Sequence, residues 1–272
     1  MTTEEWLSSH PYLRPVGDLQ AQIEAIAAAW SAPTARVPPW SDYENDFRRG
    51  VPLLHSPVNP LDPAEAGRGL QSIAHELASR PVGGAFADES KALEAELARE
   101  GDAPRHAVGW LLGQGAFETA HGGLLRYVGW AALKRHLRDV VGAFAGWRNE
   151  DHWLRGYCPT CGARPTMAQL VATAEPGRHR FLSCGCCGTR WRFRRTGCPF
   201  CTGNDDHRLQ VLGVTGEGGL RIDYCEACRG YLKTYDGQGN EAVLLADWTS
   251  LHLDVVAVDR GLKRMAGSLF DL

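Results

Sequence analysis

Four Cys-x-x-Cys pairs in one short stretch constrain this chain of 272 residues more than any other feature. The pairs are Cys158/Cys161, Cys184/Cys187, Cys198/Cys201 and Cys225/Cys228. The first and second pairs start 26 residues apart (158 to 184), and the third and fourth start 27 apart (198 to 225). This near-equal spacing indicates one binding unit that occurs twice. All nine cysteines lie in this stretch, and the ninth, Cys186, stands inside the second pair.

The clustering of the cysteines favours metal binding over disulfide bonds. Disulfide-stabilised domains are usually short and secreted, and their cysteines are spread along the chain. Here the first 157 residues contain none, and the N-terminus has neither the basic region nor the apolar core of a secretory signal. Two Cys-x-x-Cys turns supply four thiolates, the donor set of a tetrahedral Zn²⁺ or of a single iron. The sequence therefore predicts two Cys₄ sites, and its spacing suits iron and zinc equally.

The internal repeat predicts how the eight ligands are grouped. The first pair should join the second, and the third should join the fourth. An interleaved grouping, as in cross-brace domains, is the alternative. The repeat also places Cys184 and Cys187 in ligand positions and leaves Cys186 as a free thiol, although Cys186 could replace a neighbour in the run Cys-Gly-Cys-Cys.

Glycines follow the pairs and permit the positive φ that such turns often need. Gly162 and Gly188 follow directly in the first unit, whereas Gly203 and Gly230 come one residue later in the second.

Between its two turns, each unit should form a β-hairpin. Alternating residues predict hairpins over 166–183, with a turn at Pro176-Gly177, and over 207–224, with a turn at Gly216–Gly219. Each unit then corresponds to a rubredoxin-like or zinc-ribbon-like fold. A fold this small has little core, so the metal should contribute directly to its stability.

Helical patterns dominate the rest of the chain. Apolar spacing predicts helices over about 18–31 with Asp18 as N-cap, 64–79, 88–100 with Asp88 as N-cap, and 104–147 with a break or bend at Gly122-Gly123. Residues 32–63 carry seven prolines and should be extended and irregular. A strand is expected over 231–235, and the tail from Glu241 should form a helix that packs back on the protein.

These elements predict an α+β fold with four segments. Residues 1–150 form an all-helical scaffold domain, 151–195 the first rubredoxin-like module, 196–240 the second, and 241–272 a helical tail.

Composition narrows the possible functions. The formal net charge of −3 gives no reason to expect nucleic acid or an anionic membrane as partner. The longest apolar run has eight residues (Val140–Trp147), too few to span a bilayer. A soluble protein that stays in the compartment where it is made is expected. No catalytic triad order, nucleophile elbow or phosphate loop occurs, since Gly109–Gly115 lacks the following Lys-Ser/Thr. We therefore expect no enzymatic activity.

Residues 178–195 carry six arginines with Trp191 and Phe193 among them. Such a run would suit a nucleic-acid surface, as in many zinc ribbons. It equally suits a solvated strand or a protein-docking face beside thiolate sites, whose formal charge with Zn²⁺ is −2. The slightly acidic chain favours this second interpretation.

The cysteine motifs resemble those of the formate dehydrogenase accessory (formation) protein family, FdhE type. The matching runs are Tyr157-Cys-Pro-Thr-Cys-Gly162, Arg180-Phe-Leu-Ser-Cys-Gly-Cys-Cys-Gly-Thr-Arg-Trp191, Cys198-Pro-Phe-Cys201, Tyr224-Cys-Glu-Ala-Cys-Arg-Gly-Tyr-Leu-Lys233 and Asp247-Trp-Thr-Ser-Leu-His-Leu-Asp254. They extend over about 157–261, and Cys186 is an addition to the family's pattern.

The resemblance implies a cytoplasmic, non-enzymatic assembly factor with two rubredoxin-like, iron-binding modules. It also implies that the factor contacts the catalytic subunit of respiratory formate dehydrogenase before export. The residues themselves leave two alternatives open, a zinc-ribbon nucleic-acid binder and a rubredoxin-like electron carrier.

Overall fold

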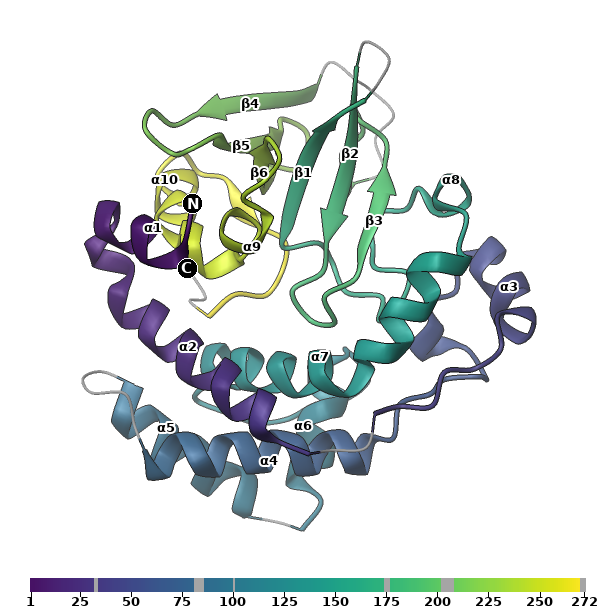
Figure 1. Cartoon of the computed structure of the whole chain (residues 1–272), viewed down its shortest axis with the longest axis vertical. Helices are drawn as coiled ribbons and strands as arrows, with labels where there is room; N and C mark the ends of the chain where they lie inside the picture. The colour runs from purple at the N-terminus through teal and green to yellow at the C-terminus, as the bar shows by residue number, and fades with distance from the viewer. Residues whose placement is uncertain (32–33, 81–85, 100, 174–176, 202–207, 270–272) are drawn as a thin grey trace.

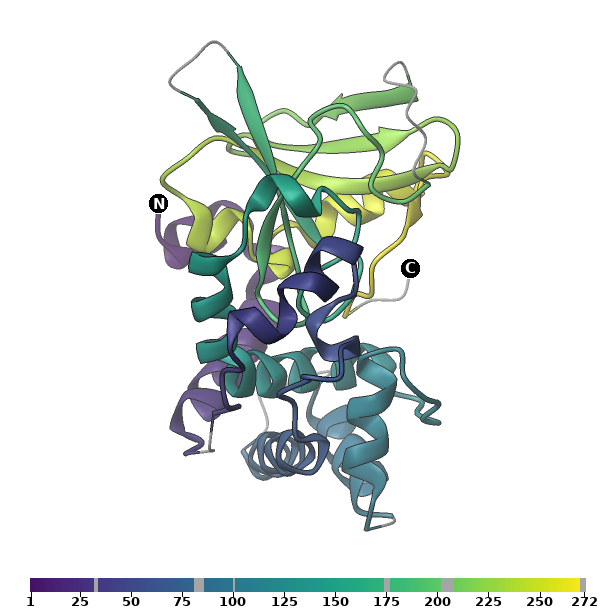
Figure 2. The same cartoon turned by 90° about the vertical axis from the view of Figure 1, so that its right-hand side faces the viewer.

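The computed structural model describes residues 1–31, 34–80, 86–99, 101–173, 177–201 and 208–269. It has a helical layer at one end and a β-sheet at the other, with the C-terminal helices against the sheet (Figures 1 and 2). The helices before the sheet are α1 (Thr3–Ser9), η1 (Pro11–Leu13), α2 (Arg14–Ala29), α3 (Trp40–Arg49), η2 (Leu53–His55), α4 (Pro63–Ser79), α5 (Phe86–Ala98), α6 (Ala103–Leu111), α7 (Gly122–Trp147) and α8 (Glu150–Trp153). This arrangement confirms the predicted α+β class.

Helix α7 is the centre of the helical layer. It contacts α2, α4, α5 and α6 and lies between α4 and the sheet (Figure 1). Leu133, Leu137, Val140 and Phe144 on one face are almost completely buried. Their successive spacing of four, three and four residues is the apolar stripe that drives helix packing. The helical layer therefore owes its stability mainly to burial around α7.

Several predicted helix boundaries are wrong. Asp18 does not cap α2, which already begins at Arg14 because Pro15 suits the first helical turn. Asp88 lies within the first turn of α5, which begins at Phe86. The break predicted at Gly122-Gly123, in contrast, is present, because the segment 104–147 is two helices, α6 and α7, and Gly122 is the first residue of the second.

The proline-rich segment is also more regular than predicted, because it contains helix α3. Its prolines fall at 33, 38 and 39 and again from 52 onward, so Trp40–Arg49 is free of them. Tyr43 and Phe47 of α3 are buried, and Gly50 ends the helix at φ 82°. Helix formation is thus allowed between the prolines and stabilised by two aromatic anchors.

The strands of both cysteine units form one mixed sheet. The strands are β1 (Met167–Ala172), β2 (Arg178–Ser183), β3 (Arg190–Phe193), β4 (Leu209–Gly213), β5 (Leu220–Cys225), β6 (Gly230–Asp236) and β7 (Lys263–Arg264). Their order is β3-β2-β1-β6-β5-β4, with β7 beside β6. β1 and β6 pair in parallel and join the two units, whereas β2 and β5 pair antiparallel with their neighbours.

Both predicted hairpins are present. In the first, Met167 pairs with Ser183, and in the second, Leu209 pairs with Cys225. The second turn lies at the predicted glycines, and Gly216 and Gly219 adopt positive φ in it. In the first predicted turn, Pro176 lies outside the described residues.

The predicted C-terminal helix is divided into three short helices. They are α9 (Glu241–Leu244), η4 (Asp247–Ser250) and α10 (Leu251–Val258). The tail packs back as expected, since η4 contacts α2 and α10 contacts β5. Within the described ranges, no helix combines the length and apolar character that crossing a bilayer requires.

A buried ion network holds this tail to β6. Lys233 is fully buried, and its Nζ lies 2.9 Å from Asp247 and 2.8 Å from Asp254. Arg264 contacts the same two carboxylates at 2.8 and 2.5 Å. Two cations thus offset two buried anions, which is the condition for tolerating charge inside a protein.

Candidate metal centres

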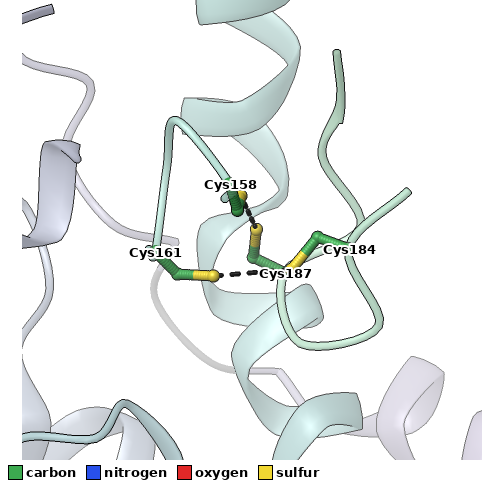
Figure 3. A group of neighbouring side chains, drawn as sticks. All are labelled: Cys158, Cys161, Cys184 and Cys187. Atoms are coloured by element: carbon green, nitrogen blue, oxygen red, sulfur yellow. Dashed lines mark hydrogen bonds between the residues drawn. The ribbon is translucent and has the colours of Figure 1, made fainter. Parts of the chain in front are cut away.

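The first cysteine cluster is completely buried between the sheet and the helical layer. Cys158 and Cys161 come from the turn after α8, and Cys184 and Cys187 from the turn between β2 and β3, with their sulfurs directed toward one another (Figure 3). The four Sγ atoms lie within 4.8 Å of one another. Cys158 lies 3.5 Å from Cys187, and Cys161 lies 3.4 Å from Cys184. A disulfide needs about 2.05 Å, whereas a tetrahedron with bonds of about 2.3 Å has edges of about 3.8 Å.

The two turns of this cluster have the same backbone geometry. The N–H of Gly162 donates to the carbonyl of Cys158 at 2.9 Å, and the N–H of Gly188 donates to that of Cys184 at 3.1 Å. Both glycines have φ of 78°, which confirms the conformational role predicted for them. The hydroxyls of Thr160 and Thr189 lie 2.8 Å apart and connect the turns.

The second cluster lies between the turn after Gly197 and the turn between β5 and β6. Sγ distances are 3.8 Å for Cys198–Cys228 and 3.8 Å for Cys201–Cys225, and all four lie within 4.8 Å. The N–H groups of Phe200 and Gly230 donate to the sulfurs of Cys198 and Cys228 at 3.4 Å. Cys201 and Cys228 are partly exposed, so this cluster is more open to solvent than the first.

One glycine prediction is wrong in the second cluster. The residue with left-handed backbone is Arg229, at φ 59°, and not Gly230. Arg229 takes the place that Gly162 and Gly188 have in the first cluster, because its N–H donates to the carbonyl of Cys225 at 2.8 Å. Gly203 lies outside the described residues.

The geometry agrees with sequential grouping and not with the interleaved alternative. Within the described residues each cluster combines two pairs from the same repeat. Cys186 is buried but belongs to neither group of four, as expected for a free thiol. The donor sets suit one zinc or one iron each. Metal ligation by these eight cysteines stays a prediction.

The pKa shifts of the cysteine thiols indicate that both clusters need a cation. Hydrogen bonding, chiefly with Cys158, and burial raise the pKa of Cys161 well above its ordinary value. Burial likewise raises the pKa of Cys198 to about 12. Burial also acts to raise the pKa of Cys187, but hydrogen bonds from Cys158 and its other neighbours lower it well below the ordinary value. Several thiolates cannot ionise together in a buried site, so a bound metal would have to displace protons.

A cavity of about 700 Å³ adjoins the first cluster. The turn residues Cys184 and Gly185 form part of its wall, together with residues of α2 and α7. Its charged lining residues are the basic Lys134, Arg135, Arg138 and Arg190 and the acidic Glu24, Glu241 and Asp247. The hydroxyl groups of Tyr127 and Ser183 are buried and have no hydrogen-bond partner among the described residues. The cavity therefore offers charged groups of both signs and spare polar atoms next to a candidate metal site.

The sequence analysis did not predict this cavity, because residues 1–150 were expected to form only a helical scaffold. Tyr127, Lys134 and Arg138 lie seven and four residues apart, so they share a face of α7. This aromatic and basic face of α7 was the sequence feature from which the cavity could have been predicted.

Internal partners are seen for Arg178, Arg180, Arg190 and Arg192 of the basic run. Arg178 pairs with Asp236, and Arg190 donates to Gln169. Arg192 lies 2.7 Å from Asp151, and the buried Arg180 donates to the carbonyl of Gly197 at 3.1 Å. Bonds of this kind within the fold favour a structural role for these four guanidinium groups over phosphate binding.

Comparison with known proteins supports the family resemblance. Residues 157–195 match the family model described as FdhE, central domain. A "Protein FdhE homolog" of Pseudomonas aeruginosa is 26% identical over 246 residues, which cover 80% of this chain and 78% of the relative. The homolog of Aquifex aeolicus is 29% identical over 49% of this chain and 48% of its own length. The homolog of Stutzerimonas stutzeri is 32% identical over 44% of this chain and 39% of its own length.

In these last two alignments the chain spans less than half of the relative's length. A crystal structure of the FdhE protein from Pseudomonas aeruginosa has the same fold, with a TM-score of 0.61 at 24% identity. The similarity covers 95% of this chain and 88% of that one. Together the comparisons confirm the resemblance that the cysteine motifs indicated.

Proposed function

Because this chain resembles the FdhE proteins in its cysteine motifs, in sequence and in fold, we propose that it is an accessory factor needed for active formate dehydrogenase. Its role is to bind the catalytic subunit of that enzyme, and not to catalyse a reaction. The observation that carries this proposal is the pair of Cys₄ clusters, one of which lies in the segment that matches the FdhE central domain.

Each cluster holds one metal ion, with iron as the proposed occupant and zinc as its competitor. Cys158, Cys161, Cys184 and Cys187 bind the first ion, and Cys198, Cys201, Cys225 and Cys228 bind the second. Iron bound by four thiolates can change its oxidation state, whereas zinc cannot. The protein's own contribution is to bring two turns together and to donate backbone N–H groups to the sulfurs, as those of Phe200 and Gly230 do.

Anaerobic purification from iron-replete cells tests the metal assignment. We expect coloured protein with two irons per chain by elemental analysis. Two zinc ions and no colour would contradict iron while leaving the Cys₄ assignment intact. A chain that retains no metal would contradict both.

The cavity beside the first cluster is the proposed contact site for the catalytic subunit. The acidic residues Glu24, Glu241 and Asp247 also line this cavity, but its α7 side is basic, with Lys134, Arg135 and Arg138, and this basic face suits an acidic segment of that partner. Lys134 and Arg138 are exposed at the rim, so a docking protein can reach them. Cys184 and Gly185 line the same cavity, and the docked segment would therefore touch the first metal-binding turn.

Co-purification with a tagged formate dehydrogenase catalytic subunit tests this contact. The double variant Lys134→Glu/Arg138→Glu should reduce the recovered complex at least tenfold, because both changes reverse the charge of the basic α7 face. Arg68→Glu is the matched control, since Arg68 is equally exposed and also pairs with a neighbouring acid. Equal recovery for the cavity variant and the control would contradict this contact. Recovery that survives Cys→Ser changes in all four pairs would separately exclude the cysteine units as the contact.

A rubredoxin-like electron carrier is the second candidate, favoured by the partial exposure of Cys201 and Cys228. Exposed ligands bring a metal within reach of a redox partner. Zinc as the native metal would remove this candidate.

A further inference from the structure

A third group of ligand-type side chains contains no cysteine and is separate from both cysteine clusters. It consists of His10 at the end of α1, Glu217 in the turn between β4 and β5, and His252 in α10. Their ligand atoms lie within 4.8 Å of one another. Glu217 Oε2 lies 3.3 Å from His10 Nε2 and 2.6 Å from His252 Nε2. The three side chains are 8%, 12% and 16% exposed, so the group is sheltered yet within reach of solvent.

Two groups face Nδ1 of His10, and Glu217 faces its Nε2. Nδ1 lies 3.0 Å from the carbonyl oxygen of Trp6, which can only accept, and 3.0 Å from the hydroxyl of Ser9, which can donate or accept. With its proton on Nδ1, the ring donates to Trp6, and the lone pair of Nε2 and the Glu217 carboxylate can bind the same metal ion. With its proton on Nε2, the ring donates to Glu217 and Nδ1 accepts from Ser9.

The geometry points to the metal ion, and we propose that His10, Glu217 and His252 bind one divalent cation of the zinc type. Two imidazoles and one carboxylate form a donor set that zinc uses with a fourth, open position. A tetrahedron with bonds of about 2.05 Å has edges of about 3.3 Å, which is the His10–Glu217 separation. The His252–Glu217 contact is shorter and lengthens when the ion enters.

The surroundings of His10 match those of known metal-binding histidines. Such histidines usually donate their second N–H to a carbonyl or carboxylate, which fixes the ring and its tautomer. Nδ1 of His10 lies within hydrogen-bond distance of the Trp6 carbonyl oxygen, and its ring stacks on the Trp6 ring at 3.8 Å. His75 offers a useful contrast, because it lies 2.6 Å from Glu94 but no third ligand joins this pair among the described residues.

The cation would connect parts of the chain that are far apart in sequence. His10 and Glu217 are separated by 207 residues, and the three ligands come from α1, the β4–β5 turn and α10. The ion would thus fasten the N-terminal helix to the second cysteine unit and the C-terminal tail. Its role is therefore distinct from that of the Cys₄ ions, each of which closes turns within one repeat.

Metal counting on the full chain tests this site. Purified protein is saturated with Zn²⁺, freed of excess ion by gel filtration and analysed for zinc and for free thiols. We expect three zinc ions per chain in the parent protein and two in His10→Ala, Glu217→Gln and His252→Ala. His75→Ala is the control and should keep three. Two ions in the parent protein, or three in Glu217→Gln, would overturn the proposal and leave a proton on Nε2 of His10 as the bridge to Glu217.

Cobalt and heat distinguish loss of this site from misfolding. Co²⁺ in the Cys₄ sites gives sulfur-to-metal absorption, which should be unchanged in Glu217→Gln. Once both Cys₄ sites are filled, further Zn²⁺ should raise the thermal midpoint of the parent protein and not that of Glu217→Gln. An equal rise in both proteins would contradict binding at Glu217.

Discussion

At the residue scale, the two clusters have the same turn but different residue types at its left-handed position. Gly188 in the first cluster and Arg229 in the second both adopt the left-handed backbone, although a side chain at such a φ is strained. The Cβ of an alanine at Gly188 would meet no atom closer than 3.9 Å, so only the backbone conformation opposes it. Substitutions at these two positions therefore measure the free-energy cost of the left-handed backbone conformation in the turn.

Exchanging the residue types at these positions should have opposite effects. We expect Gly188→Ala to lower the free energy of unfolding by about 1 kcal/mol. Arg229→Gly should leave it unchanged or raise it slightly, because relief of strain offsets the greater freedom of the unfolded chain. Denaturant unfolding of the metal-loaded proteins measures both. Equal destabilisation by the two changes would contradict the shared turn geometry.

Lys233 should be the most sensitive position of the buried ion network. Lys233→Met leaves Asp247 and Asp254 with Arg264 as their main cation, and we expect a loss of about 3 kcal/mol of unfolding free energy. Arg48→Met removes an exposed pair with Glu44 and should cost less than about 0.5 kcal/mol. Chemical denaturation compares the two variants. Similar small losses would show that Arg264 alone neutralises both acids.

Asp247 should make stability depend on pH. Burial acts to raise its pKa, but Arg264 and Lys233 outweigh burial and lower the pKa to about 2. Because the pKa in the folded state is below that of the unfolded chain, the stabilisation is present above about pH 4 and is lost as the pH falls toward 2. It amounts to about 2 kcal/mol. Between pH 6 and 3, the free energy of unfolding should fall less steeply in Asp247→Asn than in the parent protein. Identical slopes in the two proteins would contradict Asp247 as the cause.

At the scale of elements, the sequence was informative wherever a pattern is local. The alternation within 166–183 and 207–224 predicted both hairpins, and the two-residue spacing within each cysteine pair predicted the turns. Helix α3 was missed because its buried aromatic residues, Tyr43 and Phe47, depend on neighbours distant in sequence for their stabilisation. The parallel pairing of β1 with β6 could not be predicted either, since β-pairing between distant segments leaves no mark in the local pattern.

Cys184 and Cys186 provide a matched pair for testing the ligand assignment in one turn. Both are buried, but only Cys184 belongs to the first group of four. Cys184→Ser should lose one thiolate-bound metal ion, whereas Cys186→Ser should keep both. Metal analysis with Co²⁺ absorption measures the difference. If Cys186→Ser loses the ion and Cys184→Ser does not, the ligands of this turn have been assigned incorrectly.

At the scale of the whole molecule, residues of the helical layer and of the sheet that carries the cysteine clusters line one cavity. The sequence established the two layers and the repeated cysteine unit. The cavity and the His10–Glu217–His252 group arise only when distant segments meet. The division at residues 150, 195 and 240 stays a prediction, and the pairing of β1 with β6 shows that strands from both cysteine units share one sheet.

The most direct test of the central proposal is formate dehydrogenase activity in cells that lack this chain. We predict that activity is lost on deletion and restored by the parent chain and by Cys186→Ser. It should not be restored by a chain with Cys184→Ser and Cys225→Ser, which removes one ligand from each cluster. Full activity without the chain would contradict the accessory role, and full rescue by the double variant would contradict a role for the two Cys₄ sites.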